Sequence, residues 1–232
     1  MSHTREREDD RIAGTGLWIA ITGREKLRIG LINPCGVQQG RGLNATPLYR
    51  HIPPQSLIQL KSVTPREHEV VIIDENRAAI DWKQHFDLVG ITGTTVQIVR
   101  GYEIADQFRR RGIPVVMGGP HVTFMTEEAL LHCDSVVRRE ADEIWTNVLE
   151  GAANRKLKPL YDPVLPENLD FAMSQPVSRL LTIPTPRPLP QPRIMITQPQ
   201  RGCPYGCRFC SVSAFNGARV RQKSVDYVIE EL

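Results

Sequence analysis

The sequence predicts an α/β fold with a doubly wound, five-stranded parallel sheet, followed by a proline-rich linker and the start of a second domain. Within residues 26–151, short runs rich in Val and Ile alternate with stretches of helical period. Apolar runs without alternation are typical of strands that are buried on both faces of a parallel sheet. The intervening helices would supply the crossovers between parallel strands.

The expected strands are 27–32, 69–74, 87–92, 113–118 and 134–138. A first helix should follow Pro53 and Pro54, since the missing N–H of proline costs nothing in a first turn, and reach Val63. A second helix should have its apolar face along 98–108 and end at Gly112. Thr126 is expected to be the N-cap of a third helix, and Gly151 to close a fourth. The apolar face of that fourth helix is expected to hold Ile144, Trp145, Val148 and Leu149.

The flanking segments differ in composition. Residues 1–25 are charged and then interrupted by glycine, as in an N-terminal tail, and show no signal peptide. No run approaches the ~18 apolar residues that span a bilayer, so a cytoplasmic protein without a membrane span is expected. The net charge of +3 is small and its Lys and Arg are scattered, which gives no indication of a nucleic-acid partner. Ten of the 18 prolines fall between Pro159 and Pro199, so residues 152–192 are expected to be an extended linker without sheet or long helix.

The C-terminal segment, 193–232, is expected to begin a further domain. A strand is predicted over 193–198, then a cysteine loop, then a helix with Ser224 as its N-cap. Because the sequence stops on an apolar residue without a C-cap, this domain is expected to be incomplete and the chain alone inactive. The apolar face of its helix is expected to hold Val225, Val228, Ile229 and Leu232.

The cysteines fall into two groups. Cys35 and Cys133 stand alone, and each is expected to be a small buried residue or a loop residue. Cys203, Cys207 and Cys210 form a C-x₃-C-x₂-C loop. Thiolates are the usual ligands of iron–sulfur clusters, and three of them would leave one iron of a cubane open to a non-protein ligand. The alternative is a zinc knuckle, for which the sequence lacks a second pair of ligands.

The loop resembles that of the radical S-adenosylmethionine (SAM) enzymes. TQPQRGCPYGCRFC and NGARVRQKSVDYVIEEL are similar to that family's loop and to the segment that follows it. The resemblance implies a [4Fe–4S] cluster on Cys203, Cys207 and Cys210, SAM on the fourth iron, and the peptide at Phe209 against adenine. It also implies the start of a (β/α) barrel, SAM cleavage to a 5′-deoxyadenosyl radical, and an electron donor of the flavodoxin or ferredoxin type.

Polar and glycine-containing loops follow the predicted strands. Asn33-Pro34, Thr92–Thr95 and Gly118–His121 come where parallel strands end, and ligands of α/β sheets bind in the crevice outside those ends. Glycine would let the backbone approach a ligand closely. The alternative is that Gly118-Gly119 is only a tight turn. A dinucleotide site is not indicated, since no G-x-G-x-x-G follows the first strand.

The order of the parts resembles the cobalamin (B12)-binding radical SAM enzymes. HIPPQSLIQL, VVMGGPHVTF and VVRREADEIW are similar to three of that family's segments, although Arg139 stands in place of a glycine and Asp142 in place of a glutamate. The resemblance implies a Rossmann-like cobalamin-binding domain over 26–151. No D-x-H-x₂-G is present, so no histidine below the cobalt is implied. The implied cobalamin contacts are Thr92, Gly93, Thr94, Gly118, Gly119, His121 and Glu140.

The resulting hypothesis is the N-terminal portion of a cobalamin-dependent radical SAM enzyme that transfers a methyl group to an unactivated carbon of a small-molecule or peptide substrate. One alternative is a rearrangement or cyclisation enzyme whose cobalamin domain is vestigial. The other is a non-catalytic corrinoid- or metal-binding module.

Overall fold

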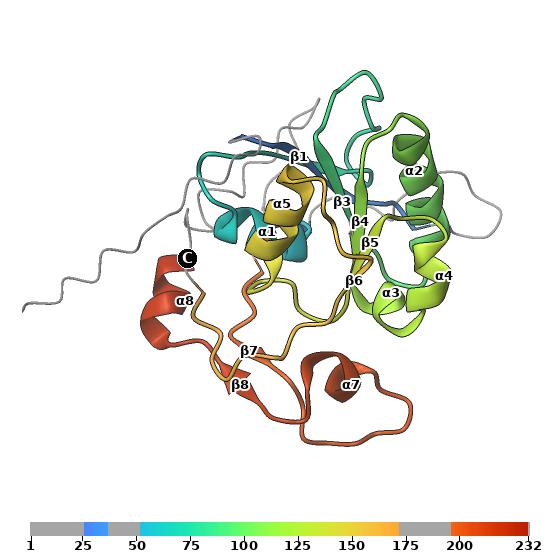
Figure 1. The fold of residues 1–232 in the computed structure, drawn as a ribbon. Coiled ribbons are helices and arrows are strands. Elements are labelled where there is room, and N and C mark those ends of the chain that lie inside the picture. The colour runs from blue at the N-terminus through green and yellow to red at the C-terminus, as the bar shows by residue number, and fades with distance from the viewer. Residues whose placement is uncertain (1–25, 37–51, 172–195, 232) are drawn as a thin grey trace, which may run out of the picture.

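The computed structural model describes residues 26–36, 52–171 and 196–231. A parallel sheet with helices on both faces makes up most of this part of the chain. The C-terminal segment lies across the end of the sheet at which the strands finish (Figure 1). None of the described helices is both long and apolar enough to cross a membrane.

The sheet has six parallel strands in the order β2-β1-β3-β4-β5-β6. The chain enters at β1, adds β2 on one side and then builds the other strands outward on the opposite side. The order therefore reverses between β1 and β3, the position at which α/β sheets open a crevice for ligands. The strands are β1 Arg28–Asn33, β2 Glu69–Asp74, β3 Leu88–Thr92, β4 Val115–Gly118, β5 Ser135–Val137 and β6 Leu160–Tyr161.

Helices cover both faces of this sheet. Helices α1 (Gln55–Val63) and α5 (Trp145–Ala153) pack on one face around Trp145. On the other face lie α2 (Ile98–Arg110), α3 (Pro120–Phe124) and α4 (Thr126–Leu130). Each face of the sheet thus has its own hydrophobic core, and β4 contributes to both. Val116 faces α5 in one core, and its neighbour Met117 faces α2 in the other. This double burial explains why the strand runs are apolar throughout.

The predicted α/β class and parallel sheet are confirmed, and the strand count needs one correction. The sixth strand, β6, follows Pro159 within the segment predicted to contain no sheet. Its pairing is set by tertiary packing, since Tyr161 is 5% exposed and belongs to the core beside α5. Two residues are too short a run to give a sequence signal. Residues 172–192 of the predicted linker and the predicted tail 1–25 lie outside the described part of the chain.

The C-terminal segment also departs from expectation. Residues 196–198 of the predicted strand are not in a strand, and 193–195 lie outside the described residues. The pairing falls further along, where β7 (Gln200–Arg201) and β8 (Arg221–Gln222) form a short antiparallel hairpin. Helix α7 (Val212–Asn216) lies between these two strands in the sequence, and α8 (Val225–Glu231) follows them.

Two helix-end predictions are wrong. Gly151 lies inside α5, where a Cβ would come within 2.6 Å of the Tyr161 hydroxyl, so it makes room for β6. The helix ends instead at Ala153, with Asn154 as its C-cap. Arg155 follows with a φ of 55°, and the N–H of Lys156 donates to the Gly151 carbonyl at 2.7 Å. Thr126 is the first residue of α4 and not its N-cap. Its hydroxyl donates a hydrogen bond back to the Val122 carbonyl at 3.0 Å and so does not cap the helix.

Helix α8 has the expected N-cap but buries a different face from the one predicted. The backbone N–H of Tyr227 donates to the Ser224 hydroxyl at 3.2 Å, which confirms the N-cap. Tyr227 and Glu231 are buried, whereas Val225 and Ile229 are 74% and 65% exposed. Of the predicted apolar face, Val228 is half-buried, whereas Val225 and Ile229 do not pack inward, and Leu232 lies outside the described residues.

Arg155 offers a test of the backbone strain at the end of α5. It is exposed and holds a left-handed conformation that glycine adopts without cost. Replacing it with glycine (Arg155→Gly) should stabilise the protein by about 1 kcal/mol and raise Tm by about 2–4 °C. Thermal unfolding followed by circular dichroism measures this. A lower Tm would contradict the assigned helix end.

Candidate functional site

A cavity of about 600 Å³ opens at the ends of the strands. One wall comes from the loops after β1, β3 and β4 and from α1. The opposite wall comes from the C-terminal segment, so neither part encloses the cavity alone. The sheet side includes Asn33, Thr92, Gly93, Thr94, Gly118 and Gly119, and the C-terminal side includes Ile196, Arg201, Val212, Phe215, Asn216 and Lys223.

Gly119 brings two of the sheet loops together. Its φ is 102°, and a Cβ there would lie 2.9 Å from the Thr92 hydroxyl and 3.0 Å from the Gly93 carbonyl. Gly118 behaves differently, since a Cβ would meet only the Val137 carbonyl at 3.6 Å. The cavity floor at Gly118 is thus open because the side chain is missing, whereas at Gly119 the glycine is needed by the fold itself.

Gln97 fixes the loops after β1 and β3 relative to each other. Its amide N–H groups donate to the Asn33 side-chain oxygen at 3.0 Å and to the Pro34 carbonyl at 2.7 Å. Its oxygen accepts from the backbone N–H and the hydroxyl of Thr94, at 3.1 and 2.9 Å. Sequence reasoning missed this residue. The signal that could have found it is an amide side chain directly between a glycine-containing loop and the apolar face of the next helix.

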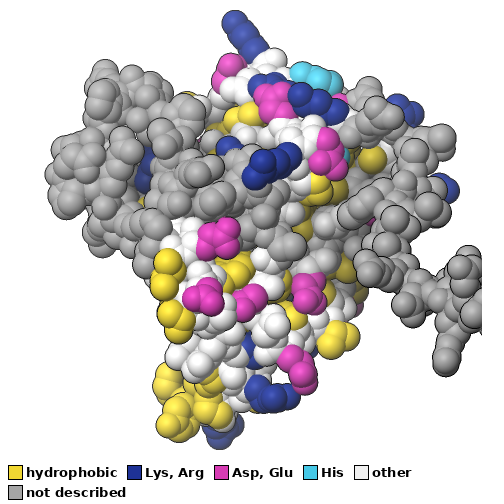
Figure 2. All heavy atoms as spheres, turned by 90° about the vertical axis from the view of Figure 1, so that its left-hand side faces the viewer, with side chains coloured by type: hydrophobic (Ala, Val, Ile, Leu, Met, Phe, Trp, Pro, Cys, Tyr) yellow, Lys and Arg dark blue, Asp and Glu magenta, His cyan; other side chains and the backbone are white. Residues whose placement is uncertain are grey.

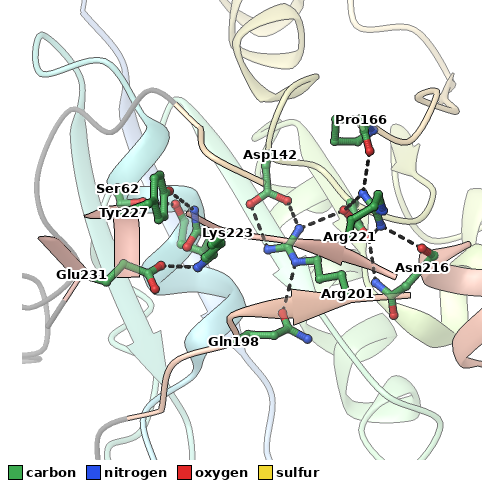
Figure 3. A network of polar contacts seen from close by, with 12 residues as sticks. Ser62, Asp142, Pro166, Gln198, Arg201, Asn216, Arg221, Lys223, Tyr227 and Glu231 are labelled. Atoms are coloured by element: carbon green, nitrogen blue, oxygen red, sulfur yellow. Dashed lines mark hydrogen bonds and ion pairs between the residues drawn. The ribbon is translucent and has the colours of Figure 1, made fainter. Parts of the chain in front are cut away.

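An ion cluster joins the loop after β5 to the C-terminal segment. Glu140 accepts hydrogen bonds from both guanidinium groups, Arg201 (3.0 Å) and Arg221, and from the Asn216 amide (2.8 Å). Asp142 accepts from Arg201 at 2.6 and 3.3 Å. Figure 3 shows Arg201 directed at Asp142, with Arg221 and Asn216 close by. All four charged side chains are 9% exposed or less, so the hairpin β7–β8 is attached to the sheet domain through buried charge.

Burial and pairing act in opposite directions on these groups. Burial by itself would raise the pKa of Glu140, but hydrogen bonds from Arg221, Asn216 and Arg201 outweigh it and hold the pKa below its ordinary value. Burial would lower the pKa of Arg201, and the carboxylates of Asp142 and Glu140 raise it instead. The charges of two acids and two arginines balance within the cluster, which is the condition for burying them.

A second contact attaches α8. The Lys223 ammonium pairs with Glu231, and both side chains are 1% exposed. The Thr197 hydroxyl donates to the other Glu231 oxygen at 2.8 Å. Tyr227 stacks under Lys223, with 5.1 Å from the nitrogen to the ring centre, and accepts from Gln59 of α1 at 3.4 Å. These contacts account for the burial of a polar face of α8 in place of its apolar one.

The cysteine loop lies between β7 and α7, and Ser211 and Val212, directly after Cys210, line the cavity. Cys203 and Cys210 are half-buried and Cys207 is exposed. Figure 2 shows hydrophobic side chains at the lower end of the molecule, which carries this loop in Figure 1. Tyr205 and Phe209 are 74% and 94% exposed. Across residues 26–36, 52–171 and 196–231, no three His, Cys, Asp or Glu side chains are grouped so as to hold a metal ion.

The predicted cobalamin contacts divide into two sets. Those on the cavity wall are Thr92, Gly93, Thr94, Gly118, Gly119 and Glu140. His121 is not on it; its Nδ1 lies 3.2 Å from the Thr95 hydroxyl and its Nε2 lies 3.3 Å from Glu128. Ligand contact by any of these residues stays a prediction. Cys35 and Cys133 are 1% and 2% exposed, as expected of structural cysteines.

Comparisons with known proteins bear on the sheet domain. Residues 45–149 match the family model of the B12 binding domain. The chain is 38% identical over 198 residues to the bacteriochlorophyllide d C-8(2)-methyltransferase of Chlorobaculum tepidum, an alignment that covers 81% of this chain and 42% of that protein. It is 29% identical to the bacteriochlorophyllide d C-12(1)-methyltransferase of the same organism, over 77% of this chain and 39% of the relative. The hopanoid C-2 methylase of Rhodopseudomonas palustris is 24% identical, in an alignment that covers 78% of this chain and 34% of that protein.

The chain thus carries a B12-binding domain, and its relatives are named as methyltransferases. It spans less than half the length of these relatives. The matched range lies within the predicted domain of 26–151.

The ion cluster should make the attachment of the β7–β8 hairpin to the sheet domain sensitive to acid. Glu140→Gln should destabilise the protein by about 3 kcal/mol or more at neutral pH, since it leaves two buried guanidinium groups short of a counter-charge. Because the pKa of Glu140 is lowered on folding, its contribution is present above the ordinary glutamate pKa and is lost as the pH falls through the lowered value. The difference between wild type and variant should therefore shrink in acid. Urea unfolding from neutral to acidic pH measures both effects.

The matched control is Glu167→Gln. Glu167 pairs with Arg219 at 3.6 Å, but the two side chains are 90% and 84% exposed, so the change should cost about 0.5 kcal/mol or less. Equal effects of the two variants would contradict the assigned role of Glu140.

Proposed function

We propose that this chain is part of a cobalamin-dependent radical SAM methyltransferase of the cytoplasm, with cobalamin at the cavity and a [4Fe–4S] cluster on the cysteine loop. One observation carries the proposal. The cavity at the strand ends of a B12-binding domain has, as its other wall, the same hairpin segment that presents Cys203, Cys207 and Cys210. The thiolate loop and the cavity therefore share one segment, since Arg201 before the loop and Ser211 and Val212 after it line the cavity.

The sheet side of the cavity suits a large ligand with polar substituents. Gly93 and Gly118 line the cavity without a side chain, and Thr92 and Thr94 add hydroxyl-bearing side chains to its wall. Gln97, which also lines the cavity, keeps the Thr94 loop in place. When bound, cobalamin would supply a carrier for the methyl group. The part of this chain is to hold the ligand between the strand ends and the hairpin, and to limit access of water.

The cysteine loop suits a cluster by its chemistry and requires a change of conformation. Its thiols are the preferred iron ligands, and a side chain at Gly206 would meet nothing within 4 Å, so the tip has room to move. The thiols are not gathered as the loop stands, so binding would bring them together. A bound cluster and SAM would supply a 5′-deoxyadenosyl radical. Phe209, being exposed, is available to the adenine of SAM.

The substrate and the reductant belong to the same proposal. The relatives' names support methyl transfer, and a small-molecule or peptide substrate and an electron donor of the flavodoxin or ferredoxin type complete the scheme. The dispersed thiols favour one second candidate, a corrinoid-binding module without radical chemistry. Iron binding separates the two.

Gly118 gives the test of cobalamin binding. Its missing side chain would point to the same side of the sheet as Val116, which also lines the cavity, and its Cβ would meet only the Val137 carbonyl, at an ordinary contact distance of 3.6 Å. Gly118→Val should therefore fold normally and weaken binding of hydroxocobalamin at least tenfold. Absorbance titration and equilibrium dialysis measure this. Gly206→Val, at an open position away from the cavity, is the control and should bind like wild type. Binding by Gly118→Val equal to that of wild type would count against the cavity as the site.

The cluster is tested by anaerobic reconstitution of the chain with iron and sulfide. Wild type should gain one [4Fe–4S] cluster with its broad visible absorption, and Cys207→Ala should lose it. Cys35→Ala removes a buried cysteine far from the loop in sequence and should keep the cluster. Stoichiometric zinc without iron in the wild-type protein would instead support the zinc-knuckle interpretation.

A further inference from the structure

Arg139 occupies a strained position at the rim of the cavity. It follows β5 with φ 57°, a conformation that glycine adopts freely and other residues rarely do. Its backbone N–H donates to the Thr123 hydroxyl at 2.9 Å, which holds the turn. A strained non-glycine residue beside a cavity is a reason to ask what its side chain does there.

The guanidinium of Arg139 lacks a close counter-charge. Its Nε is buried without a hydrogen bond and lies 4.0 Å from Asp162. The same carboxylate accepts from Arg138 at 2.7 Å. Two guanidinium groups therefore share one acid, which leaves one positive charge in excess at the rim.

The other charges on the cavity wall are already paired. Arg201 holds Glu140 and Asp142, and Lys223 holds Glu231. Among the cavity-lining residues that the structure describes, Arg139 is the charged side chain whose recorded ion pair is no closer than 4.0 Å. Arg139 is therefore a cation of the described cavity wall that no close ion pair holds in place.

We propose that Arg139 binds the anionic group of the cavity's ligand and so sets the ligand's specificity. Under the proposed function that group is the phosphodiester of the cobalamin nucleotide tail. The side chains around the corrin ring are neutral amides, so the phosphodiester is the group that a guanidinium would select. The planar guanidinium can give two parallel hydrogen bonds to a phosphate, which lysine cannot.

Three corrinoids separate the phosphate from the rest of the ligand. Cobinamide lacks the phosphate, cobinamide phosphate carries it without the base, and hydroxocobalamin carries both. Wild type should bind the two phosphate-containing ligands more tightly than cobinamide. Arg139→Gln should weaken those two about tenfold or more and leave cobinamide unchanged, while Arg139→Lys should fall between. Dissociation constants come from absorbance titrations, and Tm values confirm that the variants fold.

Arg155→Gln is the matched control, because Arg155 also has a left-handed backbone (φ 55°) but is not on the cavity wall. It should bind all three ligands like wild type. Equal weakening of all three ligands by Arg139→Gln, or no effect, would overturn the role of Arg139 and leave the proposed function standing. So would equal affinity of wild type for cobinamide and cobinamide phosphate. If wild type bound none of the three, the cobalamin proposal would fail and this inference with it.

Discussion

The carboxylate of Glu140 is buried where water cannot solvate it, so the protein itself must balance its charge. Arg201 and Arg221 do so from the two strands of one hairpin, and Asn216 adds a third hydrogen bond. Such buried pairs contribute little net stability compared with apolar packing, but they are costly to break. Their effect is therefore on arrangement: the hairpin can sit in one register against the loop after β5. The two walls of the cavity meet at this cluster, since Glu140 and Asp142 of one wall and Arg201 of the other all line it.

The cysteine loop depends on the same attachment at its base and is free at its tip. At the base, a Cβ on Gly202 would lie 1.9 Å from the Arg219 carbonyl, so the two arms of the segment are in direct backbone contact. The Cys203 N–H also donates to the Gly217 carbonyl at 3.1 Å. At the tip, Cys207 is exposed and no neighbour restrains Gly206. A loop with fixed ends and an open tip can change its side-chain arrangement without disturbing the cavity behind it.

The sheet was predictable from sequence to within about two residues per strand because both of its faces are buried and each strand run is apolar throughout. β6 could not be predicted in this way, because two residues carry no pattern and Tyr161 is held by the space that Gly151 leaves. The loops that line the cavity could be predicted from the rule that parallel strands end at the same edge of a sheet. The hydrogen-bond partners of Glu140 could not be predicted, because they lie 61 to 81 residues away in the sequence and no local pattern marks them. The buried face of α8 could not be predicted from its periodicity either, because contacts with Gln59 and Thr197, 168 and 34 residues away in the sequence, accompany the burial of Tyr227 and Glu231.

The sequence separation within the ion cluster has a consequence for the order of assembly. The strands β1 to β5 can pair with one another once β5 has been synthesised, and β6 completes the sheet soon afterwards. The hairpin residues that contact Glu140 come about 60 to 80 residues after it. Contacts between distant segments form late because closing the intervening loop costs entropy. Until the hairpin emerges, Glu140 and Asp142 would be two hydrated carboxylates at the open end of a folded domain. Nascent chains of this protein therefore pass through a stage in which the carboxylates of Glu140 and Asp142 are exposed to water. That stage ends when Arg201 and Arg221 have been synthesised and bind these carboxylates.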